Sequence, residues 1–217
     1  KDRVKRLEEN LIAIKRLWTE EKVSMVASHF SLEEASCTPV PVQKPHPPIW
    51  IGANSDEGIK RAARFGDSYY INPHNRIDTT KRQLELYKEE LHKLNKPFPD
   101  ELPMRREVFV ADDFDKAVSL CRPYLETKYS SYHNWGQDKA MPKGDDDLSL
   151  EFSELLEDRF IIGGPDEVAE KISELSSLGV NHLIMSIEWP GMPQSLVLDT
   201  MTLLSEEVFP LVHKNIS

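Results

Sequence analysis

The chain has 217 residues, of which 39% are hydrophobic and 29% charged, a composition typical of one globular domain with a sizeable core. The formal net charge of -10 argues against a general nucleic-acid or anionic-membrane surface, so we expect no nucleic-acid and no membrane partner. No apolar run is long enough to span a bilayer and no signal peptide is evident, which makes a cytoplasmic protein the expectation.

The first third of the sequence predicts a helix, a hairpin and a connector. Apolar residues recur at helical spacing near the start, at Val4, Leu7, Leu11, Ile14 and Leu17. The short, loosely alternating stretch 23–32 indicates a small hairpin. Residues 38–48 contain five prolines, which neither a helix nor a central strand tolerates, so this segment is an extended connector.

From residue 49 onward, short apolar runs alternate with helical segments. The runs predict four strands, at 49–51, 68–71, 107–111 and 183–187. Between the third and fourth lies a polar loop at 134–147, which we expect to be irregular. Strands that alternate with helices imply a parallel sheet with right-handed crossovers. A closed eight-stranded barrel needs about 250 residues, so the pattern is compatible with a small open α/β sheet or with the second half of a barrel.

Dispersed cysteines and histidines argue against a metal or redox centre. The two cysteines, Cys37 and Cys121, lie far apart in the chain and form no Cys-x-x-Cys motif, which favours a reducing compartment. The seven histidines are scattered, so we expect no metal site. No nucleophile–base pair and no paired carboxylates stand out, which suits an enzyme whose chemistry belongs to an organic cofactor.

Several motifs, in order, resemble the bacterial luciferase-like flavin-dependent monooxygenase family. They are Pro45-His46-Pro47-Pro48-Ile49-Trp50-Ile51-Gly52, Arg61-Ala62-Ala63-Arg64-Phe65-Gly66-Asp67, Arg106-Glu107-Val108-Phe109-Val110-Ala111 and Trp189-Pro190-Gly191-Met192. The resemblance covers essentially the whole chain and implies an α/β fold, the second half of a (β/α)8 TIM barrel. Residues 1–217 then form a single domain that begins inside the fourth helix, with strands one to four absent. Ala27 and Ser186 depart from the family pattern, which commonly has Gly and Arg there.

The same resemblance implies a flavoprotein oxidoreductase that oxidises a small organic substrate. The expected cofactor is FMN, with NAD(P)H or a separate flavin reductase as the source of electrons, and the expected assembly is a homodimer. A deazaflavin-dependent reductase or dehydrogenase of the same fold is the alternative. A truncated, non-enzymatic flavin-binding protein is a third interpretation, in which the fragment alone is inactive.

The turn Gly52-Ala53-Asn54-Ser55 is the predicted flavin-phosphate cradle. It joins a strand to a helix, and a helix N-terminus offers unpaired N–H groups and a positive dipole to a phosphate. In the family, the equivalent turn holds the flavin phosphate. The alternative is plain helix capping, with Asn54 as N-cap and Glu57 as its capping-box partner. The acids Asp56 and Glu57 fit that alternative and oppose an anion.

Other candidate residues lie near later strand ends. Gly163-Gly164-Pro165 is a rival cradle, but Pro165 lacks an N–H and two acids follow it, which favours a structural helix start. His74, Glu188 and Trp189 follow predicted strands and are substrate-side candidates, because barrel active sites lie at the carboxyl ends of the strands. A solvated loop histidine and a core or rim tryptophan are the alternatives.

An open half-barrel has a consequence for association. Its two outer strands expose unpaired N–H and C=O groups, and its inner face is an apolar patch. We therefore expect that the chain is not a stable free monomer. Either the remaining strands are supplied separately or two copies associate.

Overall fold

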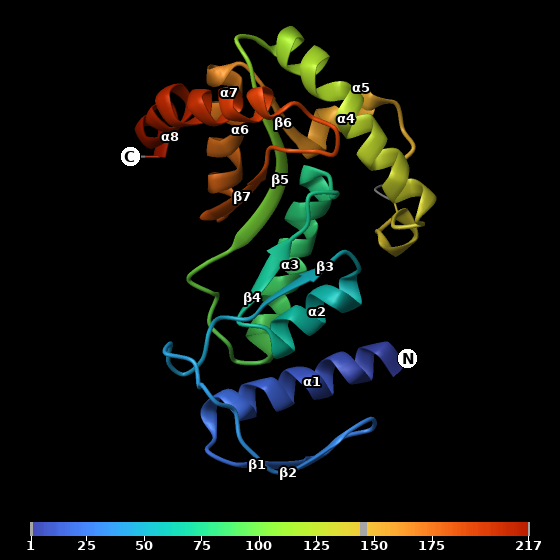
Figure 1. Cartoon of the computed structure of the whole chain (residues 1–217), viewed down its shortest axis with the longest axis vertical. Coiled ribbons are helices and arrows are strands. Elements are labelled where there is room, and N and C mark those ends of the chain that lie inside the picture. The colour runs from blue at the N-terminus through green and yellow to red at the C-terminus, as the bar shows by residue number, and fades with distance from the viewer. Residues whose placement is uncertain (1, 144–146, 217) are drawn as a thin grey trace.

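The computed structural model describes residues 2–143 and 147–216 as one succession of helices and strands (Figure 1). The first part consists of a long helix and a two-stranded antiparallel hairpin: α1 (Asp2–Thr19), β1 (Val23–Val26) and β2 (Ser31–Ala35). The remainder alternates, with β3 (Trp50–Ala53), α2 (Asp56–Phe65), β4 (Ser68–Ile71), α3 (Ile77–Lys93), β5 (Pro103–Val110), α4 (Phe114–Asn134), a 3-10 turn η1 (Asp138–Ala140), α5 (Phe152–Arg159), β6 (Phe160–Gly163), α6 (Pro165–Ser177), β7 (His182–Ser186), α7 (Gln194–Leu203), a π-helical turn η2 (Leu204–Val208) and α8 (Phe209–Ile216).

The sheet is parallel throughout. β3 pairs with β4, and β4 pairs with β5 through Ile71 and Met104. The long strand β5 has two further partners, because its first half pairs with β7 and its second half pairs with β6. The parallel pairing of the predicted second and third strands confirms the expected α/β arrangement.

The sheet curls into an arc. Side chains alternate along each strand, and those on one face, such as Tyr69, Met104 and Val108, pack against the helices. On the other face, Trp50 of β3 and His182 of β7 meet ring to ring, with centroids 4.9 Å apart. Since β4 and β5 lie between these two strands in the sheet, the contact requires strong curvature. The arrangement is that of the second half of a (β/α)8 barrel.

Two hydrophobic clusters hold the helices against this arc. The first joins β4 and β5 to α2, α3, α6 and α8, with Ile59, Leu84 and Val208 among its fully buried members. The second joins β6 and the end of β5 to α4 and α5. The helices are therefore fixed against the strands by two separate apolar clusters.

The four predicted strands are present, but the third, predicted at 107–111, begins four residues earlier as β5, and a fifth strand, β6, was missed. β6 starts at Phe160, directly after Arg159 ends α5, so no turn residue separates helix from strand. The predicted irregular loop at 134–147 contains η1, and residues 144–146 lie outside the described residues. Within the described ranges, no helix is both long and apolar enough to cross a membrane.

Candidate functional site

The predicted cradle lies where β3 ends and α2 begins. Ser55 is the N-cap of α2, since its Oγ accepts a hydrogen bond from the Gly58 N–H at 3.3 Å and its carbonyl accepts one from the Ile59 N–H at 3.0 Å. Asn54 as N-cap is therefore wrong. Its Oδ1 instead accepts a hydrogen bond from Asn72 Nδ2 at 2.8 Å, which ties the ends of β3 and β4 together.

The two acids in the first turn of α2 are each paired with a cation. Arg82 donates two hydrogen bonds of 2.9 Å to Asp56, and this lowers the pKa of the Asp56 carboxyl. Glu57 pairs with Lys60 Nζ at 2.6 Å, so its expected capping-box role is also wrong. Because both charges are compensated, they oppose an anion less than the sequence suggested. By helix geometry the N–H groups of residues 56 and 57 still lack intrahelical acceptors.

Buried side chains fix the backbone of this turn. Gln83 Nε2 donates to the Asn54 carbonyl at 2.6 Å, and Tyr69 Oη donates to the Ala53 carbonyl at 3.3 Å. The single Tyr69 hydroxyl hydrogen is shared with Gln83 Oε1 at 3.2 Å, and Gln83 Oε1 also accepts from Asn75 Nδ2 at 2.7 Å. Two consecutive carbonyls of the turn thus accept hydrogen bonds from buried side chains, which fixes the backbone of the turn.

Two glycines allow the turn its close packing. A Cβ on Gly58 would lie 2.7 Å from the Ala53 Cβ, so only glycine lets the first turn of α2 lie this close to β3. Gly52 is exposed, and a Cβ there would lie 3.4 Å from Asn72 Oδ1 and from a Tyr70 ring carbon. The backbone at Gly52 is therefore open to solvent, and a side chain there would lie against Asn72 and Tyr70.

The rival turn at Gly163-Gly164-Pro165 has acidic surroundings that do not suit an anion. Pro165 begins α6, and the Gly164 N–H donates to the carboxylate of Glu167 at 2.8 Å. The hollow of about 380 Å³ beside it is lined by five acids, Asp112, Asp113, Asp115, Asp166 and Glu167. A carboxylate already uses the helix N-terminus and the surroundings repel anions, so the geometry agrees with a structural helix start.

His74 lies beyond the end of β4 and is buried, with 4% of its surface exposed, so the solvated-loop alternative is wrong. Its ring contacts the edges of Tyr129 and Tyr132, and its Nε2 lies 3.0 Å from Gln137 Nε2. Burial, reinforced by the nearby positive charge of Lys128, lowers its pKa to about 4. His74 is therefore a neutral imidazole at physiological pH.

The two candidates after β7 differ from each other. Trp189 is buried and its indole N–H donates to Glu107 Oε2 at 2.7 Å, while its ring packs against Phe109. Trp189 is thus packed as a core aromatic, as the alternative interpretation expected. Glu188 is exposed, and no ion pair links it to another described residue.

A polar network on the inner face of β5 was not predicted from the sequence. Glu107 is fully buried and accepts from Lys128 Nζ at 2.6 Å as well as from Trp189. Arg105, two residues earlier on the same face, donates to Ser186 Oγ of β7 at 3.0 Å. Burial lowers the pKa of Lys128. The run of charged residues at 105–107, in a strand that is otherwise apolar, was the available signal.

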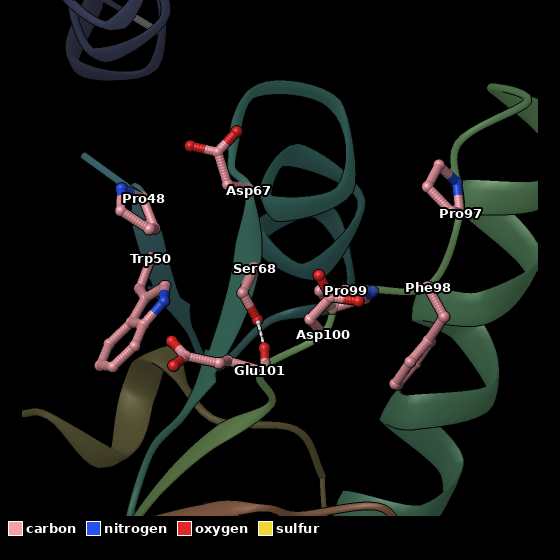
Figure 2. Close-up of a pocket in the computed structure, with 9 residues that line it drawn as sticks. All are labelled: Pro48, Trp50, Asp67, Ser68, Pro97, Phe98, Pro99, Asp100 and Glu101. Carbon is pink, nitrogen blue, oxygen red and sulfur yellow. Dashed lines mark hydrogen bonds between the residues drawn. The ribbon is translucent and has the colours of Figure 1, made fainter. Parts of the chain in front are cut away.

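Another hollow lies at the opposite ends of the strands, where β3 and β4 begin. Figure 2 shows this hollow of about 450 Å³, with its lining residues Pro48, Trp50, Asp67, Ser68, Pro97, Phe98, Pro99, Asp100 and Glu101. Ser68 Oγ donates to the Glu101 carbonyl at 2.7 Å within it. Its lining contains three acids and no lysine or arginine, so it does not suit a phosphate. Amino ends of barrel strands generally serve stability rather than catalysis.

Comparison with known proteins agrees with the curved parallel sheet. Residues 1–182 match the family model described as luciferase-like monooxygenase. The chain belongs to the luciferase-like monooxygenase family. This family assignment confirms the resemblance seen in the sequence motifs.

Relatives of the chain include enzymes with two kinds of cofactor. An F420-dependent glucose-6-phosphate dehydrogenase of Intrasporangium calvum is 27% identical over 227 residues, which cover 97% of this chain and 61% of the relative. An FMNH2-dependent dimethylsulfone monooxygenase of Pseudomonas putida is 25% identical over 195 residues, which cover 84% of this chain and 53% of the relative. The chain thus spans about three fifths or less of the length of these two relatives.

A solved structure shows the same fold. The monooxygenase RslO1 from Streptomyces bottropensis superposes with a TM-score of 0.72 at 23% identity, over 94% of this chain and 60% of that chain. Such a partial match is what half of a larger barrel gives. The family members named here are oxidoreductases of luciferase-like type, and whether the cofactor is FMN or F420 differs among them.

Proposed function

We propose that this chain belongs to a flavin-dependent monooxygenase that oxidises a small organic substrate, and that it binds the FMN phosphate at Gly52-Ala53-Asn54-Ser55. The observation that carries the proposal is the start of α2, where Asp56 and Glu57 are both neutralised by cations. The N–H groups of this first turn and the positive end of the helix dipole are left available to an anion.

The residues present fit a phosphate. Gly52 is exposed and has no side chain to keep a ligand from its backbone, and Ser55 Oγ lies at the start of the helix. A bound flavin would supply the redox chemistry. The protein's part is to fix the phosphate through backbone N–H groups and to hold the turn rigid through Gln83 and Tyr69. The buried network around Glu107 would exclude water from the inner face of the barrel.

A deazaflavin-dependent dehydrogenase is the second candidate, because relatives of both cofactor types match the chain with similar identity. Both cofactors carry a phosphate, so the cradle serves either one. In the flavin proposal the electrons come from NAD(P)H or from a separate flavin reductase. Reaction with molecular oxygen separates the two, because a monooxygenase consumes oxygen and a hydride-transferring dehydrogenase does not.

We include a homodimer in the proposal. Helix α1 exposes four large apolar side chains, Val4, Leu7, Ile12 and Ile14. β3 and β7 each pair with another strand on one side within the described sheet. Exposed apolar surface and strand edges both favour association.

Replacing Ser55 with Glu tests the cradle. The new carboxylate adds negative charge at the helix start, where the phosphate would lie, so we expect FMN affinity to fall at least about tenfold, or ~1.4 kcal/mol. Ser153→Glu is the matched control, since it places the same charge on an exposed residue in the first turn of α5. Equilibrium titration of the full chain with FMN measures both. Unchanged affinity in the Ser55→Glu protein would move the cradle elsewhere.

A further inference from the structure

His74 occupies a position suited to contact a substrate. It follows β4 by three residues, at the same carboxyl edge of the sheet as the Gly52–Ser55 turn. Arg159 Nε donates to its backbone carbonyl at 2.8 Å, and Tyr129 and Tyr132 flank its ring. Backbone and ring are thus both held, which fixes the direction of the two ring nitrogens.

Gln137 determines which ring nitrogen carries the proton. Its Nε2 amide group lies 3.0 Å from His74 Nε2. An amide NH2 can only donate, so the ring Nε2 must accept. In a neutral imidazole the other nitrogen then bears the hydrogen, and His74 presents Nδ1–H as a donor.

That donor has no acceptor in the described part of the chain. His74 Nδ1 is buried and without a hydrogen-bond partner, in a residue that is only 4% exposed. Tyr129 Oη, in the ring that flanks His74, is likewise buried without a partner. Buried polar groups are almost always satisfied, so the two unpaired atoms point to an acceptor that the described residues do not supply.

The surrounding charges select the kind of acceptor. Four cations act on the ring: Lys128 from α4, Arg105 and Arg106 from β5, and Arg159 from α5. Three residues that face the ring carry no formal charge at neutral pH: Tyr129, Tyr132 and Gln137. The carboxylate of Glu107 already pairs with Lys128 and accepts a hydrogen bond from Trp189. The ring stays neutral, and the positive potential favours an electron-rich oxygen over a cationic or apolar group.

We propose that His74 is a neutral hydrogen-bond donor, through Nδ1–H, to a carbonyl or hydroxyl oxygen of the small organic substrate, and that Gln137 is the positioning residue that fixes this tautomer. The inference rests on the proposed function, because it takes the carboxyl edge of the sheet as the substrate side. A neutral donor at this point would orient the reacting carbon and stabilise negative charge that develops on the oxygen.

Two substitutions separate the two ring nitrogens. His74→Asn can place an amide N–H near the position of Nδ1 but does not reach Gln137. His74→Gln can reach Gln137 but offers no donor at the position of Nδ1. If His74 were only a packing residue held by Gln137, His74→Gln would be the better replacement. The proposal predicts the reverse for ligand binding.

Nitrogen-15 NMR of the full chain, with acetone as the probe, tests both parts without a flavin. We expect the His74 ring to be protonated at Nδ1, and Gln137→Leu to shift it toward the Nε2–H form. Increasing acetone should move the Nδ1 resonance progressively. It should also move the side-chain amide introduced in the His74→Asn protein, and it should leave the one introduced in His74→Gln unaffected. An Nε2–H tautomer in the unmodified chain, or an Nδ1 resonance that acetone leaves unchanged, would overturn the proposal.

Turnover by the holoenzyme provides the functional readout. We expect His74→Gln and Gln137→Leu to lower kcat/KM at least about tenfold, with His74→Asn retaining more activity than His74→Gln. Equal losses in the two His74 variants would contradict a donor role. The NMR measurements need no cofactor, so they test the role of His74 separately from FMN binding. A negative NMR result can coexist with FMN binding at Ser55, and a positive NMR result can coexist with a failure of FMN to bind.

Discussion

The burial of His74 predicts a specific dependence of stability on pH. Its pKa is about 4 in the folded chain, against an ordinary value of 6.5. Between these two values the unfolded chain binds a proton that the folded chain does not. The free energy of unfolding therefore falls as pH decreases from about 6.5 toward 4, and this contribution levels off below the folded pKa.

The magnitude follows from the two pKa values. Each unit of difference corresponds to about 1.4 kcal/mol, so the full contribution is roughly 3 kcal/mol, an upper value because the protein can relax around the charged ring. Other histidines and the carboxylates titrate in the same range. They are common to the parent and to a His74→Asn variant, so the difference between the two proteins isolates His74.

Urea denaturation at fixed protein concentration, from pH 4.5 to pH 7.5, measures this difference. We expect the parent to lose stability more steeply than His74→Asn as the pH is lowered, with the curves running parallel above about pH 7. Equal slopes throughout would mean that His74 titrates normally. That result would refute both its burial and its neutral state at the site.

Three further predictions concern packing and assembly. Gly58→Ala should lower both the free energy of unfolding and the affinity for FMN, because the new Cβ would lie 2.7 Å from the Ala53 Cβ. Urea denaturation and FMN titration measure the two effects, and unchanged values would mean that α2 shifts freely. Lys96→Met should cost about 1–2 kcal/mol of stability, because Lys96 Nζ donates to the carbonyls of Ala63 and Arg64 at the end of α2, whereas Lys88→Met on the exposed face of α3 should cost little. Sedimentation at several concentrations should detect association, and a compact monomer that stays folded on dilution would contradict the proposed dimer.

The elements whose signals are local were predictable from the sequence. Apolar runs at 68–71 and 183–187 stand between turn residues, and both form strands. β6 was missed because α5 continues directly into it, so no turn residue such as Gly or Pro marks the change from helix to strand.

Parts of the site depend on contacts between distant residues, and these could not be predicted. Asn54 looks like an N-cap until Asn72, 18 positions away, takes its side chain. The sequence leaves the surroundings of Trp189 open, and its partner Glu107, which accepts the indole N–H, is 82 positions away. The neutralisation of Asp56 by Arg82 has the same origin, since it needs α3 to pack against α2.

The central claim, that the start of α2 binds the phosphate of a flavin, is tested most directly by comparing FMN with riboflavin. The two ligands differ only in the phosphate, so the ratio of their dissociation constants for the full chain isolates the contribution of the cradle. We predict that FMN binds at least about tenfold more tightly than riboflavin, and that Ser55→Glu removes most of this preference. Equal affinity for the two ligands, or a preference that survives Ser55→Glu intact, would contradict the assignment of Gly52-Ala53-Asn54-Ser55 as the phosphate site.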